Sequence, residues 1–387
     1  MPGYLFALFA IGLFTSDEPP FQPLVVDNSV SIGYGLAIGD VDGDGKPDIL
    51  LADKKQFVWY RNGDWKRFVM AENLTASDNV CIAARDIDRD GKVEVAVGAQ
   101  WNPSETADTV KSGAVFYLSR PSDPTQPWKA TALHHEPTVH RMRWVKVGST
   151  QFHLVVVPLH GRGNANGAGE GVKVLAYIPP AKQLDDATKW KYALIDRSMH
   201  LTHNLDVIPE RKNESIYIGG KEGIKAFYYD GKSWKPGPVV IADKSFGEVR
   251  RTTSGTETHV AAVEPMHGTD LTFYASSGKT NTFSRNVLTT GLNQGHALAV
   301  GDLMGLGNSQ VVVGWREPDA DKKTGIKMFI PVNNTYTQWN TLSIDDNEMA
   351  CEDLQVADLN GDDKKEIIAA GRASHNLKIY WNHAPAK

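Results

Sequence analysis

The sequence predicts an all-β fold, a seven-bladed β-propeller of four-stranded antiparallel blades. Two observations carry this prediction. Short strand-like segments recur in units of ~40–60 residues, and an acidic, glycine-rich loop recurs inside several of these units. The composition agrees, because 35 Gly, 20 Pro, 10 Trp and 12 Tyr among 387 residues suit many short strands joined by tight turns. No segment of the chain needs to be helical.

An acidic loop joins the first two strand-like segments of the first unit. Asp40, Asp42, Asp44 and Asp48 lie in a glycine-rich stretch between two short apolar runs. Alternate carboxylates in such a loop direct several oxygens toward one centre, and hard cations such as calcium prefer oxygen ligands. The pattern therefore predicts a cation that stabilises the blade, although a metal-free turn is compatible with the same spacing.

The acidic loop recurs along the chain. Two further copies are Asp86, Asp88, Asp90 and Glu94, and Asp358, Asn360, Asp362 and Glu366. A fourth copy, which follows residues 297–301, keeps the strand and the glycines but lacks the run of acids. We therefore expect structural Ca²⁺ in up to three blade loops and an empty fourth loop, with Mg²⁺ as the open alternative.

The innermost strands of the predicted blades start at seven equivalent positions. These positions are Tyr34, Val80, His140, His203, Glu248, His296 and Glu352. The last unit lacks a fourth strand, whereas residues 21–27 precede the first unit and match one. We expect this N-terminal strand to complete the seventh blade and close the ring, which removes open sheet edges. A single propeller domain then occupies residues 21–383.

The first 16 residues have the pattern of a signal peptide. Residues 4–14 are apolar, too few to span a membrane comfortably, and polar residues follow them. The segment before them lacks Lys and Arg, so a membrane tether or a mis-started N-terminus is the alternative. The prediction is export to the periplasm or the extracellular space, with no membrane span in the mature chain.

Charge and cysteine content narrow the function further. The net charge is −5 and there is no basic run, which argues against a nucleic-acid partner. Cys81 and Cys351 are the only cysteines, and the repeat register places them two blades apart. We expect both to be free, buried thiols.

Histidine is concentrated at the seven equivalent positions, which border the central channel. Three of the seven are His and two are Glu, in a chain with 12 His. Such groups converging in a cleft can bind a transition metal or act as acid and base. The alternative is that each histidine tethers a neighbouring blade by hydrogen bonds. Three long insertions all follow a second strand and should crowd one face of the disc; they cover residues 101–111, 161–171 and 316–324.

Two resemblances accompany these patterns. The acidic loops resemble the FG-GAP or VCBS repeats of extracellular propellers. Five segments, in this order, resemble the propeller domain of the aldos-2-ulose dehydratase (1,5-anhydro-D-fructose dehydratase) family and related keto-sugar lyases: residues 32–36, 139–142, 155–158, 200–203 and 264–268. The cupin region of that family has no counterpart here, so we expect any isomerase step attributed to it to be missing.

The family resemblance implies a carbon–oxygen lyase that performs β-elimination on a keto-sugar, either a 3-keto-glycoside or an anhydro-keto-sugar. A ketone acidifies the neighbouring C–H, a base removes that proton, and a metal or cation stabilises the oxyanion. His140, His203 and His296 are then the candidates for binding a divalent metal of unknown identity or for acting as the base. His160, His267 and Tyr34 are candidates for orienting the sugar or protonating the leaving group, and Arg141 is a cation at the same mouth.

Two other functions stay open. One is a non-catalytic extracellular FG-GAP-type propeller that binds carbohydrate or protein. The other is a uronate polysaccharide lyase, in which His and Arg neutralise a carboxylate. The lyase prediction needs a small carbohydrate substrate, and the sequence does not define the sugar, its leaving group or the oligomeric state.

Overall fold

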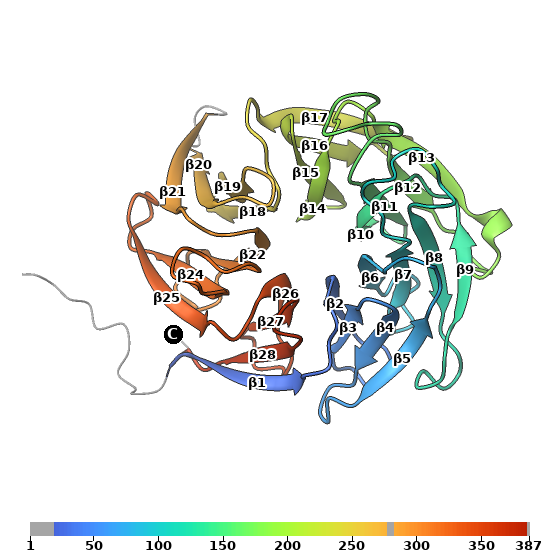
Figure 1. The fold of residues 1–387 in the computed structure, drawn as a ribbon, viewed down its shortest axis with the longest axis horizontal. Helices are drawn as coiled ribbons and strands as arrows, with labels where there is room; N and C mark the ends of the chain where they lie inside the picture. The colour runs from blue at the N-terminus through green and yellow to red at the C-terminus, as the bar shows by residue number, and fades with distance from the viewer. Residues whose placement is uncertain (1–18, 277–281, 385–387) are drawn as a thin grey trace, which may run out of the picture.

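The computed structural model describes residues 19–276 and 282–384. These residues form seven four-stranded antiparallel sheets arranged as a ring (Figure 1). The predicted seven-bladed all-β fold is confirmed. Within the described residues the helical structure is a single 3₁₀ turn, η1 (Ala187–Lys189), and no helix is long and apolar enough to cross a membrane. The predicted signal peptide, residues 1–16, lies outside the described residues.

Each blade is numbered in chain order, and its strands are given from the channel outward. Blade 1 contains β2 (Gly35–Gly39), β3 (Asp48–Ala52), β4 (Gln56–Tyr60) and β5 (Arg67–Glu72). Blade 2 contains β6 (Cys81–Arg85), β7 (Glu94–Ala99), β8 (Ala114–Ser119) and β9 (Lys129–Leu133). Blade 3 contains β10 (Val139–Lys146), β11 (Phe152–Pro158), β12 (Val174–Ile178) and β13 (Lys191–Asp196). Blade 4 contains β14 (Thr202–Pro209), β15 (Glu214–Gly220), β16 (Gly223–Tyr229) and β17 (Trp234–Ile241).

The remaining blades complete the ring. Blade 5 contains β18 (Val249–Ser254), β19 (Glu257–Glu264), β20 (Asp270–Ser276) and β21 (Phe283–Thr289). Blade 6 contains β22 (Gly295–Gly301), β23 (Gln310–Trp315), β24 (Gly325–Pro331) and β25 (Trp339–Asp346). Blade 7 contains β26 (Cys351–Ala357), β27 (Glu366–Gly371), β28 (Leu377–Asn382) and β1 (Phe21–Asp27).

The N-terminal strand closes the ring, as predicted. β1 pairs antiparallel with β28, from Phe21 opposite Asn382 to Asp27 opposite Leu377, and it forms the outer strand of blade 7 (Figure 1). Its pairing leaves the first and last blades side by side, so that the ring has no open break between them.

The core lies between neighbouring blades. The second strands, such as β3, β7 and β11, are buried along their whole length because each is covered by a blade on both faces. Trp59 of blade 1, for example, packs in one cluster with Val95 and Val97 of blade 2. Each such buried apolar side chain contributes roughly 1.5–3 kcal/mol. Cys81 and Cys351 are free and buried in this core, as expected.

The two faces of the disc carry different loops. In blade 1 the start of β2 lies opposite the end of β3, with Gly35 beside Ala52, while the acidic loop joins the other ends, with Gly39 beside Asp48. The long insertions follow β7, β11 and β23, so they share a face with the channel positions where the inner strands start. Two of these insertions contact each other, since the backbone N–H of Gly163 donates to the Thr106 carbonyl at 2.9 Å. The acidic loops lie on the opposite face.

Candidate active site

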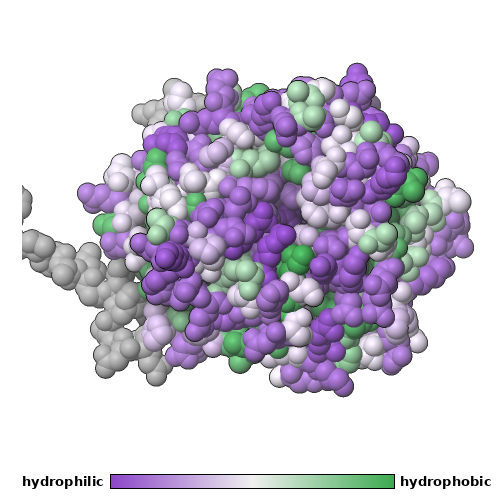
Figure 2. Space-filling view, viewed as in Figure 1, coloured by the Kyte–Doolittle hydropathy of each residue, from purple (hydrophilic) through white to green (hydrophobic). Residues whose placement is uncertain are grey.

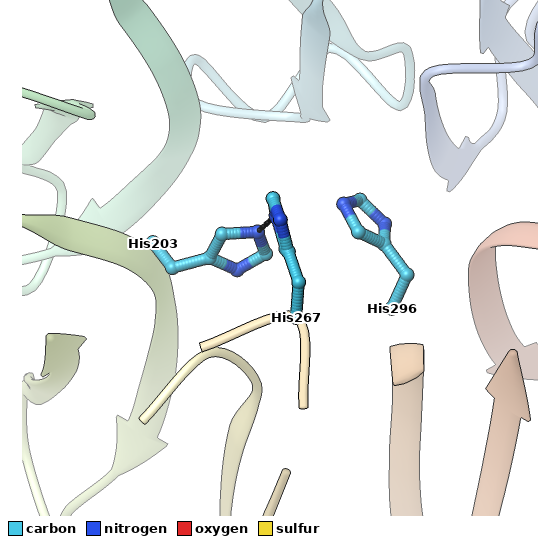
Figure 3. A group of neighbouring side chains, drawn as sticks. All are labelled: His203, His267 and His296. Atoms are coloured by element: carbon cyan, nitrogen blue, oxygen red, sulfur yellow. Dashed lines mark hydrogen bonds between the residues drawn. The ribbon is translucent and has the colours of Figure 1, made fainter. Parts of the chain in front are cut away.

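Three imidazoles converge at the centre of the ring. They belong to His203 on β14, His267 on the loop between β19 and β20, and His296 on β22 (Figure 3). One ligand atom from each lies within 4.8 Å of the others, and Nε2 of His203 is 2.7 Å from Nε2 of His267. The ring of His296 lies 5.1 Å from that of His203 and 5.0 Å from that of His267, measured between centroids.

β-Bulges change the direction of several side chains at the channel positions. The pairing of the inner strand with the second strand shifts register around His140, His203, His296 and Glu352. A bulge leaves an extra residue unpaired and redirects its side chain, and bulges are common beside active sites. Four of the seven channel positions therefore depart from the regular strand at the residue that carries the polar group.

Hydrogen bonds fix the tautomers of two imidazoles. His296 Nδ1 donates to the Glu352 carbonyl at 2.6 Å, and His140 Nδ1 donates to the His203 carbonyl at 2.8 Å. Because Nδ1 carries the proton in each ring, Nε2 holds a free lone pair. The same contacts tie one inner strand to that of the next blade, so these histidines tether blades and also present a basic nitrogen.

A carboxylate lies behind His203. Glu248 Oε1 is 3.2 Å from His203 Nδ1, although the two atoms are not aligned as a hydrogen bond. Glu248 Oε2 accepts from Asn204 Nδ2 at 2.6 Å and lies 3.4 Å from Arg250 Nη2. Burial raises the pKa of Glu248, but His203 and Arg250 outweigh it and lower the pKa to about 2. A carboxylate in this position is within reach of the second nitrogen of the imidazole, as are the carboxylates that orient histidines in metal sites.

Burial keeps the central imidazoles neutral. It lowers the pKa of His203, lowers that of His267 to about 2, and holds those of His140 and His296 well below 6.5. A neutral imidazole is the form that binds a metal ion or accepts a proton. Three neutral imidazoles backed by a carboxylate fit a divalent transition metal such as zinc.

A cavity of about 230 Å³ opens beside these imidazoles. Figure 2, viewed down the disc, shows a central hollow bordered largely by hydrophilic surface. The cavity is lined by Tyr34, Val80, Trp101, Pro103, His140, Arg141, Leu159, His267, His296, Arg316, Glu352 and Arg372. Wider hollows of about 570 and 680 Å³ lie between blades 5 and 6 and on blade 4, and among their described lining residues neither contains more than one histidine.

Cations outnumber carboxylates in the cavity lining. Arg316 Nη1 lies 2.9 Å from both oxygens of Glu352, and Arg372 Nη1 lies 3.2 Å from Oε1. The guanidinium of Arg372 covers the ring of Tyr34 at 5.6 Å. With Arg141, the lining contains three guanidinium groups against the single carboxylate of Glu352. The cavity therefore favours a ligand that is anionic or becomes anionic.

Tyr34 supplies a hydroxyl to the cavity wall. Its OH donates to Asp78 Oδ2 at 3.1 Å. Burial, followed by the charge of Asp78, raises the pKa of Tyr34 above its usual 10. The phenol thus stays protonated at neutral pH and is a proton donor.

The structure groups the predicted site residues differently from the sequence. His203 and His296 lie together as expected, but the third converging imidazole is His267, which the sequence had assigned to the sugar. His140 lies beside this group, 4.7 Å from the His203 ring between centroids, and stacks on Trp101. His203 is fully buried behind His267. His160 is not among the described residues that line the cavity.

Sequence reasoning missed Trp101. Its ring lies 5.0 Å from that of His140, and its backbone N–H donates to the Asp78 carbonyl at 2.9 Å. The available signal was an aromatic residue at the start of the first long insertion, on the face that carries the channel histidines.

The acidic loops have a common construction. The first carboxylate accepts from two backbone N–H groups: Asp40 from Gly43 at 2.6 Å and Gly45 at 2.8 Å. Asp86, Asp358 and Asp302 make the equivalent contacts. Asp302 therefore closes its turn as the others do, even though that loop lacks the following acids.

The last loop position separates the fourth copy from the rest. Asp48 accepts from the Val41 N–H at 2.8 Å, and burial raises the pKa of Asp48 to about 7. Glu94 and Glu366 accept equivalent bonds in their blades. In the fourth loop the neutral Gln310 accepts from the Leu303 N–H at 2.7 Å instead. Ligand oxygens come within 4.8 Å of one another in the first two loops, at Asp40, Asp42 and Asp48 and at Asp86, Asp88 and Asp90.

Comparisons with known proteins first identify the type of repeat and the fold. The FG-GAP-like repeat family matches residues 40–97, which hold the first two acidic loops. Among solved structures, BBS1N in complex with ARL6DN is 13% identical, covering 93% of this chain and 96% of that chain with a TM-score of 0.57. A chain of the mitotic checkpoint complex is 10% identical, covering 100% of this chain and 99% of that chain, also with a TM-score of 0.57. At these identities the likeness shows the fold alone.

The chain is also similar to the propeller domain of one enzyme. The aldos-2-ulose dehydratase beta-propeller domain family matches residues 112–277, which include His140, His203 and His267. Aldos-2-ulose dehydratase of Phanerodontia chrysosporium is 21% identical over 348 residues, 81% of this chain. The chain spans 37% of the length of that relative. These matches confirm the resemblance to the propeller domain of that enzyme and to FG-GAP repeats.

Proposed function

We propose that the protein is a carbon–oxygen lyase that catalyses β-elimination on a keto-sugar, such as a 3-keto-glycoside. The observation that carries this proposal is the set of neutral imidazoles and guanidinium groups around one small cavity at the channel mouth. A binding propeller has no need of three converging imidazoles backed by a carboxylate. The similarity to the propeller domain of aldos-2-ulose dehydratase supports the same class of reaction.

His140 is the proposed base. Its Nε2 is free because Nδ1 donates to the His203 carbonyl, and it lines the cavity. The proton it removes is the one on the carbon next to the ketone, which the carbonyl makes acidic. A positioned base of this kind contributes about 10²–10⁴-fold in rate.

Tyr34 is the proposed acid. The carbon–oxygen bond β to the ketone breaks, its electron pair goes to the leaving oxygen, and the Tyr34 hydroxyl supplies the proton. Tyr34 is protonated at neutral pH, and its raised pKa makes it a weak acid that is suited to a strongly basic alkoxide leaving group. The hydroxyl donates to Asp78 in the free protein, so this proton must turn from Asp78 to the leaving oxygen when the substrate binds.

His203, His267 and His296 are the residues that would hold a divalent metal. When bound, such a metal supplies Lewis-acid stabilisation of negative charge on the ketone oxygen. Glu248 orients the His203 ring, and the Glu352 carbonyl orients the His296 ring. The acidic loops on the opposite face are the proposed sites of structural Ca²⁺.

Uronate elimination is the second candidate. Arg141, Arg316 and Arg372 line the cavity against one carboxylate, and such an excess of cations suits a substrate carboxylate. The two candidates differ in their substrates, so one assay panel separates them.

The test is elimination from methyl 3-keto-glucoside, followed by the ultraviolet absorbance of the enone, with an oligomeric uronate in parallel. Wild-type protein should eliminate methanol from the keto-sugar, and His267→Ala should lose at least ~10²-fold in rate. His259→Gln, a buried histidine of blade 5 outside the cavity, is the matched control and should keep its rate. Failure of the wild-type protein, with its metal bound, to act on the keto-sugar would show the proposal to be wrong.

A further inference from the structure

Arg141 has an unusual position in the cavity wall. It follows the bulged residue His140 on β10, and the register shift lets both consecutive side chains line the same cavity. In a regular strand, consecutive side chains point to opposite faces. The Arg141 side chain is only 2% exposed.

The hydrogen bonding of Arg141 is incomplete. Nη1 donates to the Tyr34 carbonyl at 2.9 Å, while Nε and Nη2 are buried and have no hydrogen-bond partner among the described residues. Buried donors of a charged group are costly to leave unpaired, so they call for a partner. Nearby Asp353 stabilises the Arg141 charge electrostatically, but no hydrogen bond joins it to Nε or Nη2; its oxygens accept from the Leu36 and Leu354 N–H groups at 2.7 and 3.0 Å.

The two unpaired nitrogens are adjacent in the guanidinium plane. Nε–H and Nη2–H lie on one edge and point in parallel, which suits two oxygens that share a plane. Arg316, in contrast, already directs a single nitrogen at both oxygens of Glu352. Arg316 also donates from Nη2 to Gln294 Oε1 at 3.0 Å. Arg372 bonds Glu352 through Nη1, but its side chain is 37% exposed to water. Of the three guanidinium groups lining the cavity, Arg141 is thus the one whose unpartnered two-donor edge is buried.

We propose that this edge of Arg141 binds the ketone oxygen together with the hydroxyl oxygen on the α carbon that loses its proton, and so selects ketones that carry a hydroxyl on that carbon. This inference rests on the proposed lyase function. When the proton leaves the α carbon, that carbon becomes planar and the two oxygens become coplanar with the forming C=C bond. The edge therefore fits the transition state better than the ground state, which is the condition for raising kcat.

The complete step balances without a further reactant. The α C–H bond breaks and the proton goes to His140 Nε2. The β C–O bond breaks, and the departing oxygen takes a proton from Tyr34. The products are an enone that keeps the adjacent hydroxyl and an alcohol.

The experiment compares methyl 3-keto-glucoside with its 2-deoxy analogue, which has the ketone and the leaving group but lacks the hydroxyl on C2, the carbon that loses its proton; both compounds keep the hydroxyl on C4. Wild-type protein should favour the hydroxylated substrate by at least ~10²-fold in kcat/KM, since a site built for a hydroxyl rejects the analogue without it. Arg141→Lys keeps the charge but loses the two-donor edge, so this ratio should fall to within ~10-fold. Arg143→Lys is the control, because Arg143 Nη1 donates to the Met142 carbonyl and the residue is not among those described as lining the cavity.

Equal elimination of both substrates by the wild-type protein would overturn the role of Arg141 while leaving the lyase function intact. A ratio preserved in Arg141→Lys would overturn it too, since the hydroxyl would then be selected by another group. Elimination of neither substrate would overturn the lyase function, and this inference with it. If Arg141→Lys fails to fold, as judged by circular dichroism, the wild-type ratio alone decides.

Discussion

The imidazole of His140 donates from Nδ1 to the backbone carbonyl of His203, 2.8 Å away, and so joins the inner strands of blades 3 and 4. His296 makes the same contact with the Glu352 carbonyl, joining blades 6 and 7. The hydrogen bond that tethers the blades is also the one that leaves Nε2 free. In each of these rings, Nδ1 therefore joins two blades, and Nε2 remains available to the proposed site.

Replacing His140 should affect stability and rate together. His140→Phe keeps an aromatic ring against Trp101 but leaves the His203 carbonyl without its donor. We expect a loss of about 1–3 kcal/mol in the free energy of unfolding and at least ~10²-fold in elimination rate. Urea unfolding and the enone assay measure the two effects. Full activity in a destabilised variant would show that His140 is only a tether.

Removing the charge behind His203 should weaken metal binding. Glu248→Gln keeps the size of the side chain but replaces the carboxylate that lies 3.2 Å from His203 Nδ1. We expect metal affinity to fall by about 10–100-fold, measured by competition with a chromogenic chelator. Glu214→Gln is the control, since Glu214 pairs with Arg85 at 2.8 Å and lies opposite Pro209, at the end of β14 that is far from His203. Equal affinity in the two variants would contradict the proposed role of Glu248.

The pH dependence of stability should contain a contribution from His153. Burial lowers the pKa of His153 to about 4, and its Nδ1 accepts from Trp234 Nε1 at 3.2 Å. The unfolded chain, with a pKa near 6.5, binds more protons than the folded protein between pH 6.5 and 4, so stability falls as pH falls through that window. The contribution is on the order of 1–3 kcal/mol.

His153→Gln keeps an acceptor for Trp234 but does not titrate. Its free energy of unfolding should therefore change less than that of the wild type between pH 7 and 4.5, in urea titrations at each pH. Parallel curves for the two proteins would show that His153 does not titrate on unfolding.

Calcium should stabilise the fold through the complete acidic loops. A cation that binds only the folded state adds about 2.7 kcal/mol at 100 times its Kd, so the Tm should rise with Ca²⁺ and fall with chelator. Asp42→Asn should reduce this increment, because Asp42 is one of three carboxylates converging in its loop. Asp302→Asn should not, since the loop closed by Asp302 carries neutral Gln310 at its last position. An equal reduction in both variants would contradict this division of the loops.

Deleting residues 1–27 should destabilise the whole ring. It removes β1 and leaves β28 as an unpaired edge strand. We expect a lower Tm and a tendency to associate, measured by differential scanning fluorimetry and light scattering. A deletion variant as stable and monodisperse as the full chain would contradict closure by β1.

The repeats predicted the fold because each blade carries its own copy of the signal. The closing strand β1 could also be predicted, because the last unit lacks a fourth strand and residues 21–27 belong to no other unit. The channel positions followed from the same register, and two of the three converging imidazoles, His203 and His296, occupy them. Their arrangement was harder to predict, because it depends on where the repeats differ.

His267 shows this limit. It lies on the loop between β19 and β20, outside the repeated register, so no alignment of repeats could bring it to His203. The bulges at His140, His296 and Glu352 could not be predicted either, for a different reason. A one-residue register shift leaves no mark in the pattern of apolar residues. Trp101 belongs to an insertion whose sequence differs from those that follow β11 and β23, so comparing repeats does not predict its position.

The most direct test of the central claim is the stoichiometry of the reaction on methyl 3-keto-glucoside, followed by proton NMR in buffered D₂O. We expect one methanol released for each enone formed, at a rate that falls at least ~10²-fold in His140→Phe. An unchanged spectrum after prolonged incubation with metal-loaded wild-type protein, with neither product appearing, would contradict it.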